Sequence, residues 1–349
     1  MFGTADAATP SAAAPSVITA AGAPSFTDGS GIHVVSQQNL DGRDLSLNIV
    51  PAALGRQVNV RVLLPSGYGA NPQSRYPTLY LFPGTNGAGS DWVNSGNAEA
   101  TTAGQGLITV MPDIGFRNPD GTPDGGSYFT NWVDTHTPLG PSAWETYHIN
   151  ELIPWIDGNL RTIATRNGRA VAGLSQGGYG AFAYAARHPD MFVSAGSFSG
   201  APDIDYNPLI AIGATAVIEY TANQLDGVEP EAMFGSRLTN ESNWQAHDPA
   251  DLAGNLRGID LELYTGNGIP GPLDSGPPNL GASGVEAMTF ASTMSFAQRA
   301  SSLGVPYHLN YYGNGTHTWP YWSRDFAQYM VPLMNTFAHP PSTAVTRRA

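Results

Sequence analysis

Residues 169–180, which read RAVAGLSQGGYG, constrain the fold of this chain more than any other part of the sequence. The first six of them suit a buried strand, residues 173–177 form a Gly-x-Ser-x-Gly pattern, and an Ala-rich helical run follows from Ala181 to His188. A serine in this context lies on a tight turn between a strand and a helix, with its hydroxyl above the edge of a sheet. The segment therefore predicts a strand–turn–helix unit with Ser175 as a candidate nucleophile.

Short apolar runs recur at wide spacing along the rest of the chain. Val58, Val60 and Val62 alternate with Asn59 and Arg61, as in a half-buried strand. Short apolar runs occur at 78–82, 107–111, 169–174, 192–198, 259–264 and 307–311. Apolar strands separated by helices are typical of a sheet that is covered on both faces. Helical patterns lie between several of them. The fold class predicted is α/β, with a mostly parallel central sheet and helices on both faces.

Three helical patterns are regular enough to place. Apolar residues at 149, 152, 153, 156 and 160 follow the helical period, and Pro154 is expected to kink that helix. The same period appears at 326, 330, 333 and 337. A further helix is expected over residues 286–302, opened by Glu286.

The domain organisation follows from composition. The pattern is globular over residues 31–337, without an internal repeat or linker, which indicates one catalytic domain. Residues 1–30 are rich in Ala and Pro and are expected to be flexible, as is the tail at 338–349. The first 25 residues contain neither a positive segment nor a compact apolar core, so they do not form an intact signal peptide. We expect a secreted or cell-envelope protein whose signal has been removed; a disordered cytoplasmic N-terminus is the alternative.

Charge and cysteine content exclude several classes of function. The net charge is −13, so the basic footprint needed for nucleic acid is absent. The chain has no cysteine, which excludes disulfides, thiolate metal sites and a cysteine nucleophile. No apolar run approaches the roughly 18 residues of a transmembrane helix. No metal or cofactor is expected.

The glycines around Ser175 have a steric role in the predicted turn. Side chains at Gly173 and Gly177 would clash with the tightly turned backbone. The backbone N–H of Gln176, near the start of the helix, would point at an oxyanion that develops on a substrate. This pattern predicts nucleophilic catalysis by Ser175.

A serine nucleophile needs a base, and the chain order expected in this kind of fold is serine, acid, histidine. His317 lies in a loop between the last predicted strand and the last helix, where it could reach Ser175. His308 falls within a strand pattern and His339 in the Pro-rich tail. His317 is therefore the predicted base.

Spacing alone leaves two candidates for the acid that orients this base. Asp274 and Glu286 both follow the strand predicted at 259–264. Asp274 lies in a Gly/Pro loop, where it could equally serve the turn. Glu286 opens a predicted helix, where a carboxylate could simply favour the helix dipole. The residues themselves do not distinguish the two.

Three motifs together resemble the antigen 85 mycolyltransferase and esterase D-like branch of the α/β-hydrolases. They are Gly-Leu-Ser-Gln-Gly-Gly at 173–178, Tyr-Thr-Gly-Asn-Gly at 264–268 and Asn-Gly-Thr-His-Thr-Trp-Pro-Tyr-Trp at 314–322. The resemblance covers roughly residues 45–335. It implies the α/β-hydrolase fold, Glu286 as the acid, and the backbone N–H of Thr85 as a second oxyanion donor.

The sequence departs from that branch at two points. The trehalose-handling members carry an Asp and an Arg in the loop after an early strand, where this chain has Pro83 and Asn86. The cysteine pair of the family is also absent. The first departure weakens an assignment of mycolyl transfer to a sugar, and the resemblance is closer to the plain secreted esterases.

These observations predict a secreted serine carboxylesterase that works through a Ser-His-Glu triad and an acyl-enzyme. The partner expected is a small or lipid-like ester substrate. Phe129, Trp132 and Trp319 are expected to line an apolar cleft for the acyl group, whereas Trp322 is expected in the core. An acyltransferase that moves an acyl chain to a sugar or glycerol is the first alternative. A non-catalytic envelope or adhesion protein with a hydrolase fold is the second.

Overall fold

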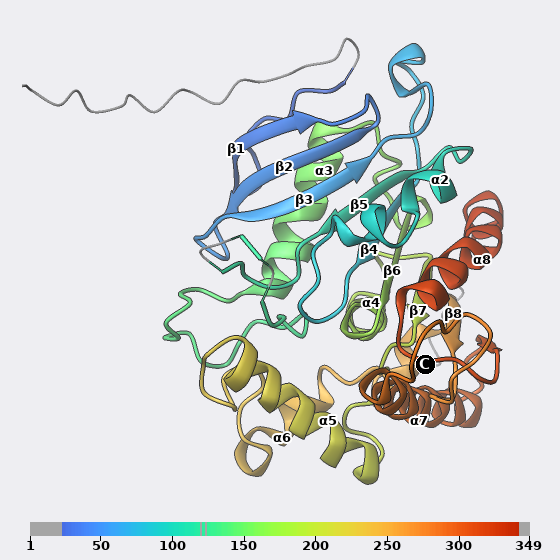
Figure 1. Cartoon of the computed structure of the whole chain (residues 1–349). Coiled ribbons are helices and arrows are strands. Elements are labelled where there is room, and N and C mark those ends of the chain that lie inside the picture. Colours follow the sequence, from blue (N-terminus) through green and yellow to red (C-terminus); the bar gives the residue numbers. More distant parts are fainter. Residues whose placement is uncertain (1–22, 119–120, 123, 342–349) are drawn as a thin grey trace, which may run out of the picture.

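The computed structural model describes residues 23–118, 121–122 and 124–341, and its helices and strands alternate along most of the chain (Figure 1). The strands are β1 (Ile32–Asn39), β2 (Asp44–Pro51), β3 (Val58–Leu63), β4 (Thr78–Phe82), β5 (Ile108–Pro112), β6 (Arg169–Leu174), β7 (Ser194–Phe198), β8 (Asp260–Thr265) and β9 (His308–Tyr311). The α-helices are α1 (Asp91–Asn94), α2 (Ala98–Thr102), α3 (Ile153–Asn159), α4 (Gln176–Arg187), α5 (Pro208–Tyr220), α6 (Arg237–Gln245), α7 (Leu280–Ser302) and α8 (Trp319–Ala338).

Within the described residues, nine strands form one sheet in the order β1-β2-β3-β5-β4-β6-β7-β8-β9. β1, β2, β3 and β5 pair antiparallel, whereas every pair from β5 to β9 is parallel. The blue strands β1–β3 form one end of the sheet in Figure 1. The structure confirms the predicted α/β class and the mostly parallel sheet, and it adds an antiparallel extension at the N-terminal end.

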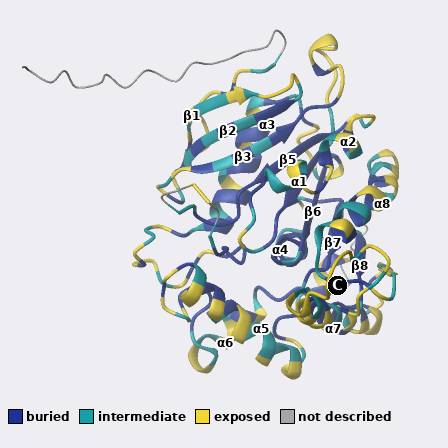
Figure 2. Ribbon diagram, viewed as in Figure 1, coloured by how far each residue is buried: buried dark blue, intermediate teal, exposed yellow. Residues whose placement is uncertain are grey.

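Side chains of the central strands supply apolar cores on both faces of the sheet. In β4, Tyr80 and Phe82 belong to a core that includes residues of α3, α4 and α7. Leu79 and Leu81 belong to the opposite core, which includes residues of α1, α2 and α8. Because consecutive side chains of a strand alternate between faces, a strand covered on both sides is apolar throughout. The central strands β5 and β6 are accordingly dark in the burial view, whereas β1 is partly teal (Figure 2).

The predicted strands are all present, and β1 and β2 are additional. Leu45, Leu47 and Ile49 of β2 are fully buried, while the residues between them are partly exposed. This strand pairs antiparallel on both sides, so only one of its faces has to be apolar. Its alternating pattern is less conspicuous than the continuous apolar runs of the parallel strands.

Two helices differ from their predicted form. A kink was expected at Pro154 within one helix. Instead, a π-helical segment at Thr146–Leu152 precedes α3, and Pro154 lies in the first turn of α3. A proline is tolerated there because the first N–H groups of a helix have no intrahelical acceptor. The prediction that Glu286 opens a helix is wrong. α7 begins at Leu280 with Asn279 as its cap, and the side chain of Asn279 accepts from the N–H of Ala282.

The packed structure begins before the predicted boundary at residue 31. Phe26 is buried against Trp155, with ring centroids 5.0 Å apart, and its N–H donates to the side chain of Gln37. The remainder of the predicted N-terminal segment (residues 1–22) and residues 342–349 of the predicted tail lie outside the described residues. No helix in the described part of the chain is long and apolar enough to cross a membrane.

Candidate active site

Ser175 occupies a backbone conformation that few residues other than glycine adopt. Its φ is 52° and its ψ −123°, at the turn between β6 and α4. A Cβ on Gly173 would lie 2.5 Å from the carbonyl carbon of Gly177, and one on Gly177 would lie 2.3 Å from the carbonyl oxygen of Pro83. Both distances are far inside van der Waals contact. The local sterics therefore require the two glycines that the sequence pattern predicted, and they hold Ser175 in a strained conformation.

His317 lies against the hydroxyl of Ser175. Its Nε2 is 2.8 Å from Ser175 Oγ, although 142 positions separate the two residues in the chain. The loop after β9 presents His317, and the backbone N–H of His317 donates to the carbonyl oxygen of Ala282 on α7. The indole of Trp322 packs edge-on against the imidazole with ring centroids 4.8 Å apart. The imidazole is thus held between a helix and an aromatic ring.

Glu286 completes this chain of hydrogen bonds. Its Oε2 lies 2.8 Å from Nδ1 of His317, and the residue has no exposed surface. Its Oε1 accepts from the N–H of Gly266 at 2.7 Å and from the hydroxyls of Ser199 and Thr265 at 2.9 and 3.1 Å. Burial favours the neutral acid, but His317 and these donors outweigh it and hold the pKa of Glu286 below its ordinary value. A buried carboxylate of this kind holds the imidazole with Nδ1 as the donor and Nε2 free to accept a proton.

Asp274, the other candidate acid, lies in the same region and contacts other groups. It accepts from the N–H of Gly271 at 2.7 Å, from the hydroxyl of Tyr321 at 2.8 Å, and from the hydroxyl of Thr316. These bonds hold the pKa of Asp274 below its ordinary value, against the opposing effect of burial. Asp274 thus fixes the loop that carries His317, whereas Glu286 contacts the imidazole itself.

Two backbone amides, those of Gln176 and Thr85, are expected to face an oxyanion. Within the described residues, neither the N–H of Gln176 nor that of Thr85 donates to a protein acceptor. Both residues line the cavity that opens above Ser175. The loop of Thr85 is held by Asn86, whose N–H donates to the carbonyl oxygen of Gly125 at 2.8 Å and whose Oδ1 accepts from the N–H of Gly125 at 2.7 Å. Among the residues that the structure describes, the cavity wall that contains Ser175 therefore also contains two backbone donors without a protein acceptor.

A large, mostly apolar cavity of about 1150 Å³ contains Ser175 and His317 in its wall. Helix α5 supplies much of this wall, including Leu209, Ala214 and Val217, and α7 supplies Val285 and Met288 opposite. Figure 1 shows α5 beside α6, away from the blue end of the sheet, and a side-chain bond between Thr215 and Arg237 joins the two helices. The cavity can accept an extended apolar group next to the nucleophile.

Of the aromatic residues expected to line this cleft, only Trp319 does so. Phe129 is 1% exposed and packs against Phe82 and Tyr184 in the core. Trp132 is 4% exposed, and its indole N–H donates to the carbonyl oxygen of Ser127. Neither side chain is part of the cavity wall, because the backbone turns at Phe129 (φ 54°) direct this segment into the core. Trp322, expected in the core, is 7% exposed and also borders the cavity.

The apolar wall formed by α5 was not anticipated. Its sequence, PLIAIGATAVIEY, is apolar nearly all the way round and contains one charged residue. Leu209 and Ile212 are nevertheless 81% and 71% exposed, and exposed residues are visible along the helix in Figure 2. A helix that is apolar on every side is usually buried. The apolar sequence of α5 was the signal available beforehand, but only its exposure in the structure shows that the apolar side chains are not all packed in the core.

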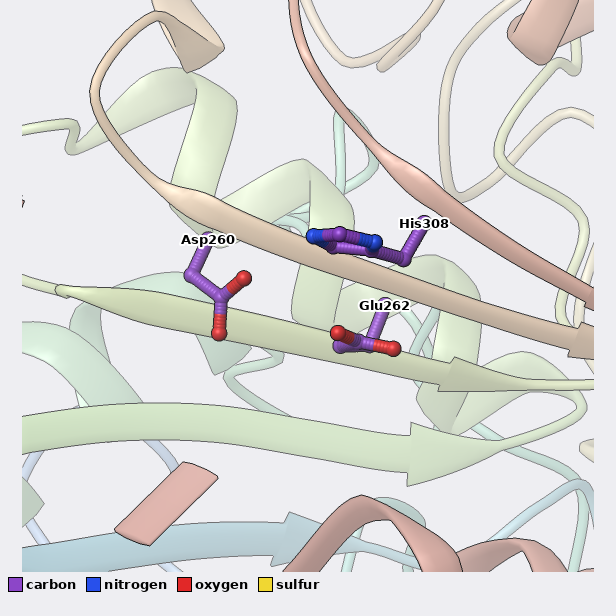
Figure 3. Close-up of side chains that lie close together, drawn as sticks. All are labelled: Asp260, Glu262 and His308. Atoms are coloured by element: carbon purple, nitrogen blue, oxygen red, sulfur yellow. The ribbon is translucent and has the colours of Figure 1, made fainter. Parts of the chain in front are cut away.

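A second group of titratable side chains lies at the amino-terminal half of β8, away from the triad. Asp260, Glu262 and His308 bring potential ligand atoms within 4.8 Å of one another, with His308 opposite Glu262 on the neighbouring strand (Figure 3). Asp260 accepts from Thr336 and Ser194 at 2.8 and 3.2 Å. Asn310 donates to Glu262 at 3.1 Å, and burial raises the pKa of Glu262. These bonds tie the β8 carboxylates to α8, β7 and β9, which is a structural role.

Residues 51–332, which contain Ser175, Glu286 and His317, match the family described as "Putative esterase". Over 287 residues, the chain is 31% identical to the esterase Rv1288 of Mycobacterium tuberculosis, covering 80% of the chain and 57% of that protein. The chain therefore spans little more than half the length of this relative.

Two further similarities cover most of both proteins. The chain is 30% identical over 310 residues to the diacylglycerol acyltransferase/mycolyltransferase Ag85A of Mycobacterium gordonae, covering 84% of this chain and 81% of the other. The crystal structure of MPT51 from Mycobacterium tuberculosis superposes with a TM-score of 0.64 at 27% identity, covering 82% of this chain and 95% of the other. These matches confirm the resemblance drawn from the sequence motifs and the α/β-hydrolase type of fold.

Proposed function

The chain belongs to the family of putative esterases, and from that premise we propose that it is a serine carboxylesterase that acts through an acyl-enzyme on Ser175. The observation that carries the proposal is the continuous line of hydrogen bonds from Ser175 Oγ through the His317 imidazole to Glu286, with 2.8 Å at each step. Such a line allows a serine hydroxyl to lose its proton as it attacks.

Acylation begins with attack of Ser175 Oγ on the ester carbonyl carbon. The hydroxyl proton passes to Nε2 of His317, and the carbonyl electron pair becomes an oxyanion that the amides of Gln176 and Thr85 bind. Glu286 stabilises the imidazolium by its charge and by the bond to Nδ1. When the oxyanion collapses, the bond to the leaving oxygen breaks, and that oxygen takes the proton from His317. The alcohol departs and the acyl group stays on Ser175.

Deacylation repeats these steps with water in the place of the serine. His317 accepts a proton from the water as its oxygen attacks the acyl carbon, and a second oxyanion forms at the same two amides. Its collapse breaks the bond to Ser175 Oγ, which regains a proton from His317. The products are a carboxylic acid and the free enzyme.

The acyl group of the substrate is proposed to be apolar. Most of the side chains of α5 and α7 that line the cavity are apolar, among them Ile210, Val217, Val285 and Met288. A cavity of about 1150 Å³ exceeds the roughly 300–1,000 Å³ of ordinary small-molecule sites, which leaves room for a chain of several carbon atoms.

The test is hydrolysis of p-nitrophenyl esters by the wild-type chain and by Ser175→Ala. The wild type should release p-nitrophenol and react with a fluorophosphonate probe at Ser175, identified by mass spectrometry of the labelled peptide. Ser175→Ala should lose both properties while keeping its cooperative thermal transition. Turnover retained in Ser175→Ala would remove this residue from the role. A folded wild type that takes up no probe would favour the non-catalytic envelope or adhesion protein.

Acyl transfer is the second candidate function, and the 30% identity to an acyltransferase supports it. It would use the same three residues and differ only in whether an alcohol replaces water at the acyl-enzyme. The loop that carries Thr85 has Pro83 and Asn86 and so offers no charged clamp for a sugar. We therefore expect the free acid to dominate when glycerol or trehalose is added, with the products separated by mass spectrometry.

A further inference from the structure

We propose that the side-chain hydroxyl of Thr85 is a third donor to the oxyanion, and that the carboxamide of Gln176 sets its direction. The inference rests on the proposed ester hydrolysis and assigns a further catalytic group within it. The hydroxyl would act beside the backbone amides of Gln176 and Thr85, two residues that line the cavity together with Ser175.

The orientation of the Gln176 carboxamide follows from its partners. Its Oε1 accepts from the backbone N–H of Tyr128 at 3.2 Å. A backbone N–H can only donate, so the carboxamide oxygen must be the atom that faces Tyr128. The other end, Nε2, then faces Oγ1 of Thr85 at 2.9 Å. An NH₂ group can only donate, and Thr85 Oγ1 is therefore the acceptor of this bond.

This bond leaves the hydroxyl hydrogen of Thr85 available. A threonine hydroxyl has one hydrogen and two lone pairs, and the Gln176 carboxamide occupies a lone pair. Within the described residues, Thr85 Oγ1 donates to no protein acceptor. Thr85 is half-buried and lines the same cavity as Ser175 and His317. The hydrogen is thus directed away from Gln176 and is free to meet a substrate oxygen bound at the Thr85 N–H.

The carboxamide is itself held in a fixed position. Gln176 is 5% exposed, and a Cβ on Gly126 would lie 2.4 Å from its amide atoms. Tyr128, which supplies the N–H, has a φ of 46°, an unusual conformation for a tyrosine. A donor that is oriented before the substrate arrives costs no reorganisation as charge develops, which is the condition for effective transition-state stabilisation.

The first test compares Thr85→Val with Thr85→Ser. Valine keeps the shape and the backbone N–H but has no hydroxyl, whereas serine keeps the hydroxyl. We expect Thr85→Val to lose about 10²-fold in kcat with KM nearly unchanged, the usual effect of one lost oxyanion donor. We expect Thr85→Ser to stay within a few-fold of the wild type. Equal activity of Thr85→Val and the wild type would overturn the proposal.

A second variant separates catalysis from support of the loop, because Thr85→Val also leaves Nε2 of Gln176 without an acceptor. Gln176→Met removes that group while keeping its backbone N–H. If the loss arose only from the unpaired carboxamide, Thr85→Val with Gln176→Met would recover to the level of Gln176→Met alone. If the hydroxyl binds the oxyanion, the double variant stays as slow as Thr85→Val, and Gln176→Met alone loses less.

An alkyl boronic acid, which forms a tetrahedral adduct on the serine, provides an independent readout. In Thr85→Val its inhibition constant should rise by the same factor by which kcat/KM falls. A lower kcat in Thr85→Val with unchanged boronate binding would overturn the proposal. Ester hydrolysis by the wild type is the reference in each assay, so an inactive wild type would count against the proposed function and not against this inference.

Discussion

Asp274 accepts a hydrogen bond from the hydroxyl of Thr316, the residue that precedes His317. The same carboxylate also accepts from the hydroxyl of Tyr321 at 2.8 Å, in the first turn of α8. Asp274 thus joins the loop after β8 to residues on either side of His317 in the chain. A carboxylate next to a candidate triad can therefore support the geometry of the base without contacting it.

The two carboxylates are expected to respond differently to neutralisation. Glu286→Gln should lower kcat by about 10³–10⁴-fold, because an amide can impose the wrong tautomer on His317. Asp274→Asn should cost less than about 10-fold in kcat, since it weakens loop anchors without changing the group at Nδ1. Both are measured as kcat/KM on a p-nitrophenyl ester. A larger loss in Asp274→Asn than in Glu286→Gln would reverse the assignment of the acid.

Replacing Ser175 by glycine is expected to stabilise the fold relative to replacing it by alanine. The backbone at Ser175 has φ 52° and ψ −123°, a conformation that glycine adopts without a Cβ clash. Such strain costs about 1–3 kcal/mol in other residues. Both variants lose the nucleophile and the contact with His317, so the difference between their thermal midpoints isolates the strain. Equal midpoints would show that the turn carries none.

Alanine at two glycines should have opposite effects on stability. In Gly177→Ala the new Cβ would lie 2.3 Å from the carbonyl oxygen of Pro83 and 2.6 Å from that of Phe82, so it should destabilise by about 3 kcal/mol or more. Gly284→Ala in α7 meets no atom within 4 Å and should stabilise by about 1 kcal/mol through helix propensity. Urea unfolding measures both. A tolerated Gly177→Ala would contradict the close approach of the turn to the loop after β4.

Asp226 is expected to make the folded protein less stable as the pH rises. Burial and the nearby charge of Asp124 raise its pKa to about 8. A carboxyl group with a raised pKa in the folded state contributes stability that is present below its unfolded pKa of about 4 and lost as pH rises through about 8. Asp226→Asn resembles the protonated acid and should remove this loss. The thermal midpoints of the wild type and of Asp226→Asn are measured from about pH 5 to about pH 9, and their difference is compared across this range. A difference that does not change with pH would contradict the raised pKa of Asp226.

A charge in the cavity wall should select against long acyl chains. Val217 of α5 lines the cavity, and an aspartate there would have to lose its water to contact an acyl chain. We expect Val217→Asp to raise KM for p-nitrophenyl laurate by about 10-fold and leave the acetate ester unchanged. Leu238→Asp is the control, because Leu238 is 94% exposed on α6 and is not part of the cavity wall. Parallel losses on both esters would indicate a damaged fold.

Much of the fold and the centre of the candidate site could be predicted from the sequence because local rules encode them. Strands buried on both faces need mostly apolar runs, and such runs located β4, β5, β6 and β7, whose residues are all buried. The turn at Ser175 requires glycine on both sides within five residues. Neither feature depends on how distant segments pack.

Other features depended on packing between segments that are far apart in the chain. Phe129 and Trp132 resembled cleft residues, yet both fill the core, since the direction of a side chain follows from the backbone turn that carries it. Helix α5 was not identified as a cavity wall, because its opposite wall is α7, about seventy residues later in the chain.

The sequence by itself determined the strand–turn–helix at Ser175 and a histidine in the loop after the last strand, because short-range sterics and the alternation of strands and helices specify both. Residue spacing left two carboxylates open as the partner of His317, and the family resemblance implied Glu286. Only the tertiary structure shows which of them makes the contact. That contact depends on where α7 begins and how it packs beside β8, and the spacing of residues along the chain does not contain this information. The same holds for the Gln176 carboxamide, whose partners Tyr128 and Thr85 come from two separate loops.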